Sequence, residues 1–192
     1  MMISSIQHID EVILRAIHVN GQNQVFDVLM PWLRNPYFWA PFYLFLLVWM
    51  WQQFGRRGLW WCLFFFVTFT FCDFVSASLI KPWVHRLRPC QDENLSFILR
   101  ELVTCGSGYS FPSSHAANHT GLAVFMILTL GHQFRWVKPV AILWALGVCY
   151  AQMYVGVHYP SDILGGAFIG AIIAFLISRY MAFRFGFGKA SH

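Results

Sequence analysis

Charged residues are scarce in this sequence. Only 11% of its 192 residues are Asp, Glu, Lys or Arg, and just eight of these are acidic. Hydrophobic residues make up 58% of the chain, aromatic residues make up 19%, and the mean hydropathy is +0.54. A soluble domain usually contains about 25% charged residues. The shortage of charge therefore excludes an ordinary soluble domain and indicates an integral membrane protein, for which we expect no nucleic-acid partner.

The sequence also lacks an internal repeat, a low-complexity linker and a basic segment leading into a short apolar core, so we expect no removable signal peptide. Hydrophobic runs near the roughly 20 residues that cross a bilayer occur at 37–54, 58–80, 114–131, 137–156 and 162–183. They predict an all-α fold, a polytopic bundle of five to six transmembrane helices. Because they leave no room for a soluble domain, we expect residues 1–192 to form one membrane-embedded domain with its catalytic core at 58–183.

The N-terminal segment, residues 1–36, differs from these runs. Isoleucines recur at helical spacing between Ile6 and Ile17, but acidic, basic and amide side chains interrupt them. Such a pattern is typical of a helix that lies in the membrane interface. The stretch that follows, 25–33, contains Pro31 and is too short to cross a bilayer alone.

Basic residues without accompanying acids mark one side of the predicted bundle. By the positive-inside rule, these segments face the cytoplasm. The N-terminus, the loop 81–113 and the turn 156–162 then lie on the opposite, outer side. The basic residues concerned are Arg56 and Arg57 after the first span, Arg135 and Lys138 after the third, and Arg179, Arg184 and Lys189 near the C-terminus.

Cations begin and end the first motif of the outer side, which runs from Lys81 to Arg88 and Pro89. Long cationic side chains at the end of a stiff span can converge on one anion, and a guanidinium matches the geometry of phosphate oxygens. Alone the signal is weak, because lysine and arginine often occupy membrane boundaries for structural reasons. For Arg100, later in the same loop, the simpler expectation is that it binds anionic headgroups or pairs with the nearby acids Asp92, Glu93 or Glu101.

The second motif, Phe111-Pro112-Ser113-Ser114-His115, stands where a span begins. A helix start offers unpaired amide groups and the positive end of its dipole, which together can cradle an anion. We expect Ser113 and Ser114 to assist, although Ser113 can equally be a helix cap, and His115 to pass a proton. We interpret His119, one turn later, as a packed polar residue.

The third motif places His158 four residues before Asp162, with Pro160 and Ser161 at the start of the last span. A hydrogen bond from the ring to the carboxylate fixes one tautomer and leaves the other nitrogen free to attack. In isolation such a pair is more often a pair of interfacial polar residues. The coincidence of three motifs on one face favours a nucleophile.

Two cysteines, Cys90 and Cys105, bracket part of the outer loop. In an oxidising compartment a disulfide between them closes a loop of about 15 residues, worth roughly 3 kcal/mol of stability. The alternative is a pair of free thiols.

The order and spacing of these motifs resemble those of the type 2 phosphatidic acid phosphatase superfamily, over residues 58–183. The resemblance implies that Lys81 and Arg88 hold a phosphate with Ser113 and Ser114, that His115 is the general acid, and that His158 is a nucleophile oriented by Asp162. It also implies a metal-independent phosphatase without cofactors, multi-pass in a bacterial cytoplasmic membrane, with a site that faces the periplasm. The partners it implies are the bilayer and a lipid phosphate: undecaprenyl diphosphate, phosphatidic acid, phosphatidylglycerol phosphate or lipid A phosphate.

One position departs from that pattern. Six residues before His158, where the family has arginine, this chain has Gln152, which can donate hydrogen bonds to a substrate but carries no charge. Loss of one donor to a developing charge costs roughly 3–4 kcal/mol when nothing replaces it. Arg86 or His85 are the substitutes that the sequence suggests.

Three functions remain open from the sequence. The first is the lipid phosphate phosphatase just described. The second, motivated by Gln152, is a catalytically weakened binder or transporter of lipid phosphates. The third is a metal-dependent membrane hydrolase. His115 and His119 are four residues apart, a spacing on a helix that can bind zinc, and His158 and Asp162 would be further ligands.

Overall fold

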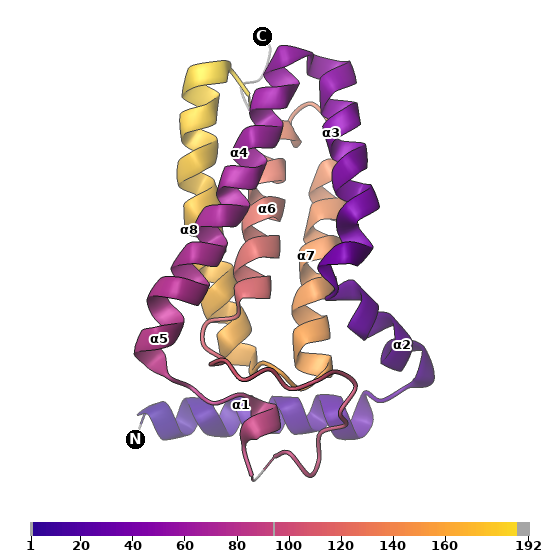
Figure 1. The fold of residues 1–192 in the computed structure, drawn as a ribbon, viewed down its shortest axis with the longest axis vertical. Coiled ribbons are helices and arrows are strands. Elements are labelled where there is room, and N and C mark those ends of the chain that lie inside the picture. Colours follow the sequence, from indigo (N-terminus) through magenta and orange to yellow (C-terminus); the bar gives the residue numbers. More distant parts are fainter. Residues whose placement is uncertain (1, 94, 188–192) are drawn as a thin grey trace.

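The fold was analysed in a computed structural model that describes residues 2–93 and 95–187; Lys189 lies outside them. The described residues form helices and connecting loops, and no strand occurs among them. The helices of the bundle run side by side in Figure 1. They are α3 (Ala40–Phe54), α4 (Arg56–Asp73), α6 (Ser114–Leu130), α7 (Val137–Tyr154) and α8 (Pro160–Phe185).

Among the described residues, three stretches are long and apolar enough to cross a membrane: α7, α8 and the stretch Arg56–Gln91. In that stretch α4 leads through a π-helical segment, η2 (Phe74–Ile80), into α5 (Lys81–Val84). The other two bundle helices, α3 with 15 residues and α6 with 17, are shorter and pack beside them. The predicted all-α, polytopic helical bundle is confirmed.

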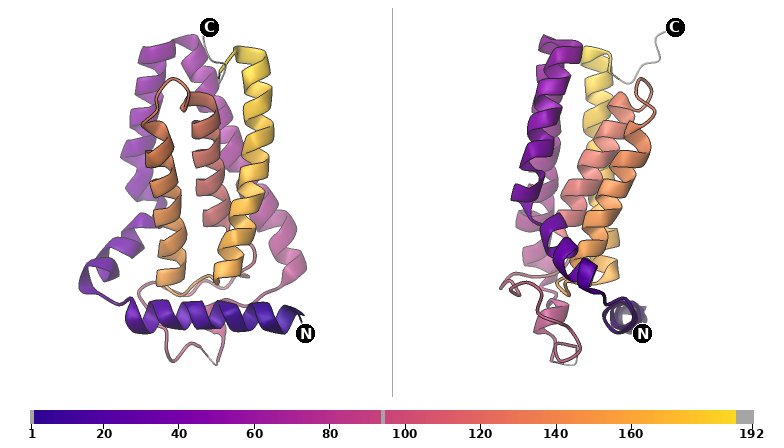
Figure 2. Two further views of the ribbon diagram at one scale, coloured as in Figure 1. Left: turned by 180° about the vertical axis from the view of Figure 1, so that it is seen from behind. Right: turned by 90° about the vertical axis from the view of Figure 1, so that its right-hand side faces the viewer.

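The N-terminal segment forms α1 (Met2–Asn20), α2 (Gln24–Leu33) and the short η1 (Pro36–Trp39). Helix α1 lies across one end of the bundle, and the right-hand view of Figure 2 shows it nearly end-on. Ile6, Ile9 and Val12 are exposed, whereas Asp10 and Leu14 are buried. A helix that lies across the end of the spans, with apolar side chains exposed, has the arrangement of a helix in the plane of a membrane surface.

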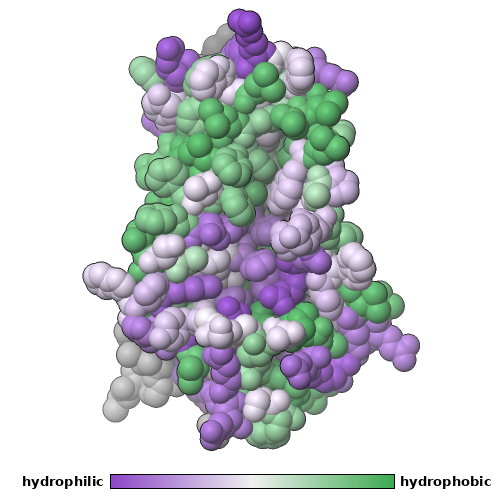
Figure 3. All heavy atoms as spheres, viewed as in Figure 1, coloured by the Kyte–Doolittle hydropathy of each residue, from purple (hydrophilic) through white to green (hydrophobic). Residues whose placement is uncertain are grey.

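The two ends of the bundle differ in what they carry. The turns after α3 and α6 lie at the end far from α1, together with the C-terminal end of α8 (Figure 1). The loop 85–113 and the turn between α7 and α8 lie at the α1 end. On the face shown in Figure 3, hydrophobic side chains form a belt over the upper part of the bundle, and hydrophilic ones gather in the lower half. All three sequence motifs therefore lie at one end.

Helices α6 and α8 touch through glycines. A Cβ atom on Gly166 would lie 2.3 Å from the carbonyl oxygen of Ser113, and one on Gly170 would lie 2.1 Å from that of Ala117. Since real Cβ atoms do not approach so closely, only glycine permits this helix spacing. The Ser113 amide also donates to the Asp162 carbonyl at 3.0 Å. These backbone contacts join the second motif to the third.

The loop 85–113 is fixed by covalent and ionic contacts. Cys90, in the short η3 (Pro89–Gln91), forms a disulfide with Cys105, with the two Cα atoms 6.0 Å apart. The predicted pairing of Arg100 with an acid of its own loop is wrong: Arg100 pairs with Asp27 of α2, donating from Nη1 to Oδ2 at 2.6 Å. The sequence does not show this contact, because α2 meets the loop only in the folded chain.

Candidate functional site

His158 and Asp162 are buried neighbours at the junction of α7 and α8. The side chain of His158 is 3% exposed and that of Asp162 is 0% exposed. His158 Nδ1 lies 3.5 Å from Asp162 Oδ2, which is longer than an ordinary hydrogen bond, and the predicted hydrogen bond between ring and carboxylate is not formed. The Tyr159 amide donates to the same carboxylate oxygen at 2.8 Å. The carboxylate is therefore fixed by the first turn of α8.

The other oxygen of that carboxylate is held by Arg86. Arg86 Nη1 donates to Asp162 Oδ1 at 2.7 Å and to Ser161 Oγ at 2.7 Å. Its Nη2 donates to Asp10 Oδ2 at 2.7 Å, and the guanidinium lies 4.1 Å from the centre of the Tyr159 ring. The charge of Arg86 is thus shared between two buried carboxylates. The prediction that Arg86 substitutes for the missing cation is not supported by this arrangement.

Asp10 brings helix α1 into the site. Its Oδ1 accepts from the Ser161 amide at 2.9 Å, and its Oδ2 accepts from the Ser161 hydroxyl. Gln7, one turn earlier, accepts from Arg86 Nη2 at 2.7 Å. The N-terminal helix is therefore joined by side-chain contacts to the start of α8. The sequence marked Asp10 only as an interruption of an apolar pattern, and no local signal identified its partners.

Lys81 and Arg88 lie close enough to His158 for their charges to act on it. Arg88 Nε donates to the Gly108 carbonyl at 2.8 Å, and the neighbouring Gln91 donates to the Gly106 carbonyl at 3.0 Å. Both carbonyls follow Cys105, so the disulfide brings these acceptors to the arginine. Within residues 2–93 and 95–187, neither Lys81 nor Arg88 forms an ion pair with an acid. They remain available to an anionic ligand.

The start of α6 carries the second motif. The Ser113 hydroxyl accepts from the Ala116 amide at 3.4 Å, so this serine caps the helix. The buried Ser114 hydroxyl has no hydrogen-bond partner among the described residues. His115 donates from Nε2 to the Arg34 carbonyl at 3.2 Å. His119 donates to the His115 carbonyl and packs edge-on against Trp144, as expected for a packed polar residue.

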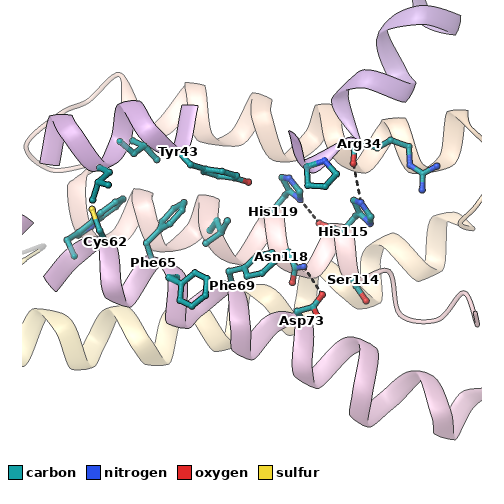
Figure 4. A pocket seen from close by; sticks show the side chains of 16 residues that line it. Arg34, Tyr43, Cys62, Phe65, Phe69, Asp73, Ser114, His115, Asn118 and His119 are labelled. Atoms are coloured by element: carbon teal, nitrogen blue, oxygen red, sulfur yellow. Dashed lines mark hydrogen bonds between the residues drawn. The ribbon is translucent and has the colours of Figure 1, made fainter. Parts of the chain in front are cut away.

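A cavity of about 520 Å³ opens beside His115. Its polar residues include Arg34, Asp73, Ser114 and His115, and in Figure 4 these lie toward one end, with Tyr43 and Cys62 toward the other. Asp73 accepts from Asn118 Nδ2 at 3.0 Å, so the acid within the second span has a hydrogen-bond partner on α6. A volume of this size is typical of ligand sites, and the division into a polar and an apolar end suits an amphipathic ligand.

The structure brings most of the predicted site residues together but places them unequally. Ser114 and His115 line the cavity; Lys81, Arg88, His158 and Asp162 do not. His158 is nevertheless close enough to His115 for an electrostatic interaction. Arg34, from the N-terminal segment, lines the cavity and was missed by sequence reasoning.

Gln152 lies in the last turn of α7 and is 0% exposed. Neither its amide nitrogen nor its amide oxygen has a hydrogen-bond partner among the described residues. The other proposed substitute for the missing cation, His85, packs its ring edge-on against Tyr109 with centroids 4.5 Å apart.

The metal-site alternative can be tested against side-chain positions. Among residues 2–93 and 95–187, no group of three or more His, Cys, Asp or Glu side chains is arranged so that it could hold a metal ion. His115, His119, His158 and Asp162 are therefore not grouped as ligands, and the geometry gives the metal-dependent hydrolase no support.

Comparisons with known proteins agree with this architecture. The sequence model of the PAP2 superfamily matches residues 59–185. Lipid A 4'-phosphatase of Bacteroides thetaiotaomicron is 35% identical over 88% of this chain and 75% of its own length. Undecaprenyl-diphosphatase of Sulfolobus acidocaldarius is 34% identical over 53% of this chain and 47% of its own length. The chain belongs to the PAP2 superfamily.

A solved structure shares the fold. The PAP2-type phosphatidylglycerolphosphate phosphatase of Bacillus subtilis superposes with a TM-score of 0.70 at 22% identity, covering 94% of this chain and 89% of that one. Together the bundle, the family and its phosphatase relatives define this protein as a membrane phosphatase of the PAP2 superfamily.

Proposed function

We propose that the protein removes phosphate from a membrane lipid through a phosphohistidine on His158, at the outer face of a bacterial cytoplasmic membrane. The observation that carries the proposal is the cavity, with His115 and Ser114 at its polar end and aromatic side chains beyond them. An amphipathic ligand fits this division, because its phosphate meets the polar groups while its hydrocarbon chain meets the apolar wall.

In the proposed reaction, His158 attacks phosphorus in line with the bond to the lipid oxygen. As the nitrogen–phosphorus bond forms, the phosphorus–oxygen bond breaks and His115 gives its proton to the departing oxygen. Water then attacks the phosphohistidine, His115 takes a proton from it, and inorganic phosphate leaves. Lys81 and Arg88 neutralise the equatorial oxygens in both steps, and Asp162 orients the ring of His158.

The charges at the two ends of the bundle support this location. The basic turns that hold Arg56, Arg57 and Arg135 lie at the end far from the motifs. The positive-inside rule places that end in the cytoplasm. The proposed site then faces the periplasm, and we propose that residues 1–192 act as one membrane-embedded unit that takes its substrate from the outer leaflet.

The test is phosphate release from a panel of lipids by the purified protein in chelator. The panel contains lipid A, undecaprenyl diphosphate, phosphatidic acid and phosphatidylglycerol phosphate. We expect lipid A to be hydrolysed, because the Bacteroides thetaiotaomicron relative, matched over 88% of the chain, carries that name. Release of phosphate only when divalent metal is supplied contradicts the phosphohistidine route.

The weakened binder remains the second candidate because of Gln152, which is buried and uncharged. The variant Gln152→Arg separates the two. Lipid binding without phosphate release in the wild type, and release in Gln152→Arg, favours the binder. Release by both proteins favours the enzyme.

The pH profile tests the nucleophile. Burial, together with the charges of Arg88 and Lys81, lowers the pKa of His158 from 6.5 to about 4, while Asp162 raises it. The attacking ring must be neutral, so on the acid side activity falls as the pH drops through this lowered pKa. In Arg88→Met the pKa of His158 rises, and the acid limb of kcat/KM moves to higher pH. Measuring kcat/KM of both proteins between pH 4 and 8 checks this, since the substrate's own ionisation cancels in their ratio. A ratio of the two kcat/KM values that does not change with pH contradicts the expected shift of the acid limb.

A further inference from the structure

The proposed phosphate site has a deficit of positive charge. Gln152 occupies the position of the family's arginine and is neutral. Arg86, which lies between Lys81 and Arg88 in the sequence, forms ion pairs with Asp10 and Asp162, both at 2.7 Å. Lys81 and Arg88 are then the cations that remain from the three motifs. A phosphoryl group in transfer spreads negative charge over three equatorial oxygens, so a further donor has a large effect.

Arg34 stands at the place where such a donor is needed. It follows the last residue of α2, and its carbonyl accepts the hydrogen bond of His115 Nε2 at 3.2 Å. In Figure 4 its guanidinium extends beyond His115, on the side away from the aromatic residues Phe65 and Phe69. It also lines the same cavity as Ser114 and His115. One residue therefore holds the ring of the proposed acid with its backbone and presents a cation beside it.

The Arg34 guanidinium is free of acidic partners. Within residues 2–93 and 95–187, it forms no ion pair. The partly buried group lies close enough to Arg88 to be affected by it: burial, and then the charge of Arg88, lower the pKa of Arg34. Two guanidinium groups that approach each other without an intervening carboxylate repel, and an anion between them removes that repulsion.

We propose that Arg34 binds the substrate's phosphate as the third cation of the site, in place of the arginine that is absent at position 152. The inference rests on the proposed phosphatase function and identifies a substrate-binding residue outside the three motifs. The planar fork of the guanidinium can donate to two phosphate oxygens at once. Because Arg34 lies between α2 and η1, the N-terminal segment becomes part of the phosphate site.

The test uses Arg34→Gln, Arg34→Lys, Gln152→Arg and the double variant Arg34→Gln with Gln152→Arg. Arg135→Gln is the matched control, an exposed arginine in the turn at the opposite end of the bundle. The first readout is phosphate release from dioctanoyl phosphatidic acid and from lipid A. The second is the rise in melting temperature that orthovanadate produces, which reports anion binding without turnover.

Arg34→Gln is expected to lower kcat/KM roughly 100-fold, the effect of losing one preorganised donor, and to remove most of the vanadate-induced rise. Arg34→Lys is expected to retain part of the kcat/KM and part of the vanadate-induced rise in melting temperature, because lysine keeps the charge but lacks the planar guanidinium. In the double variant, the arginine at 152 restores activity toward the wild-type level.

Three results overturn the inference: wild-type activity in Arg34→Gln, a vanadate response that is intact in it, or no recovery in the double variant. If Arg34→Gln does not accumulate, Arg34→Lys decides, and a value of kcat/KM equal to that of Arg135→Gln rejects the role. A wild-type protein that releases no phosphate from any lipid rejects the proposed function instead. Because vanadate binding is measured separately, the two failures are distinguishable.

Discussion

Replacing His158 with alanine is expected to reduce phosphate release by at least about 10⁴-fold, the scale of loss when a covalent nucleophile is removed. The ring is buried against Asp162, and Lys81 and Arg88 act on it. No other imidazole is close enough to Asp162 to form an ion pair with it in the described chain. The measurement is the initial rate of phosphate release from the best lipid of the panel. His132→Ala, an exposed histidine near the opposite end, is the control.

The intermediate gives a sharper test of the same nucleophile. In His115→Asn the water that hydrolyses the phosphohistidine is no longer activated, so a substrate with a good leaving group, such as p-nitrophenyl phosphate, is expected to yield one rapid turnover and then stall. Radioactive phosphate should then remain on the protein, stable in base and labile in acid, and mass spectrometry should place it on His158. Label on a serine, or none in the stalled protein, contradicts the proposed mechanism.

Replacing Arg86 with methionine is expected to lower both stability and turnover. The side chains of Asp10 and Asp162 are 3% and 0% exposed, and Arg86 contacts both at 2.7 Å. Removing one partner of a buried ion pair costs about 3–5 kcal/mol, because the other charge is left without compensation. Thermal unfolding in detergent measures the first effect. The second is a fall in kcat with little change in KM, because Arg86 acts on the carboxylate that orients His158 and does not face the substrate.

The companion variants separate positioning from mere folding. Asp10→Asn leaves Arg86 with Asp162 and should lower kcat less than Arg86→Met does. Combining Asp10→Asn with Arg86→Met should restore part of the stability that Arg86→Met loses, because one of the two carboxylates left without a partner is then removed. Arg100→Met removes the more exposed pair with Asp27 and serves as the control, with the smaller effect on unfolding. Equal losses in Arg100→Met and Arg86→Met contradict a special role for the buried network.

The helical bundle could be predicted from the sequence because a membrane span is a long local signal. The run 137–156 became α7 (Val137–Tyr154), and the run 162–183 became α8 (Pro160–Phe185). Motif spacing likewise placed His158 beside Asp162, since the residues are four apart at a helix start. Each of these inferences needed only residues near one another in the chain.

The contacts of the N-terminal segment could not be predicted in this way. Asp10 pairs with Arg86 and Asp27 pairs with Arg100, and Arg34 is close enough to Arg88 for their charges to interact. Each of these interactions spans more than fifty residues of sequence. Their partners depend on where α1 and α2 dock after the bundle has formed. The pairing predicted for Arg100 was wrong for this reason: nearby acids in the sequence are not the nearest acids in space.

The glycine contact between α6 and α8 restricts how this protein can diversify. Gly166 and Gly170 bring backbone close to backbone at two points between the helix that carries His115 and the helix that begins beside His158. Substitution of these glycines cannot adjust the separation of the His115 and His158 rings by small steps; it can only break the contact. Side chains of α3 and α4, such as Tyr43, Leu47 and Phe66, line the cavity without this restriction. New lipid preferences should therefore evolve in that wall, while the chemistry is inherited unchanged.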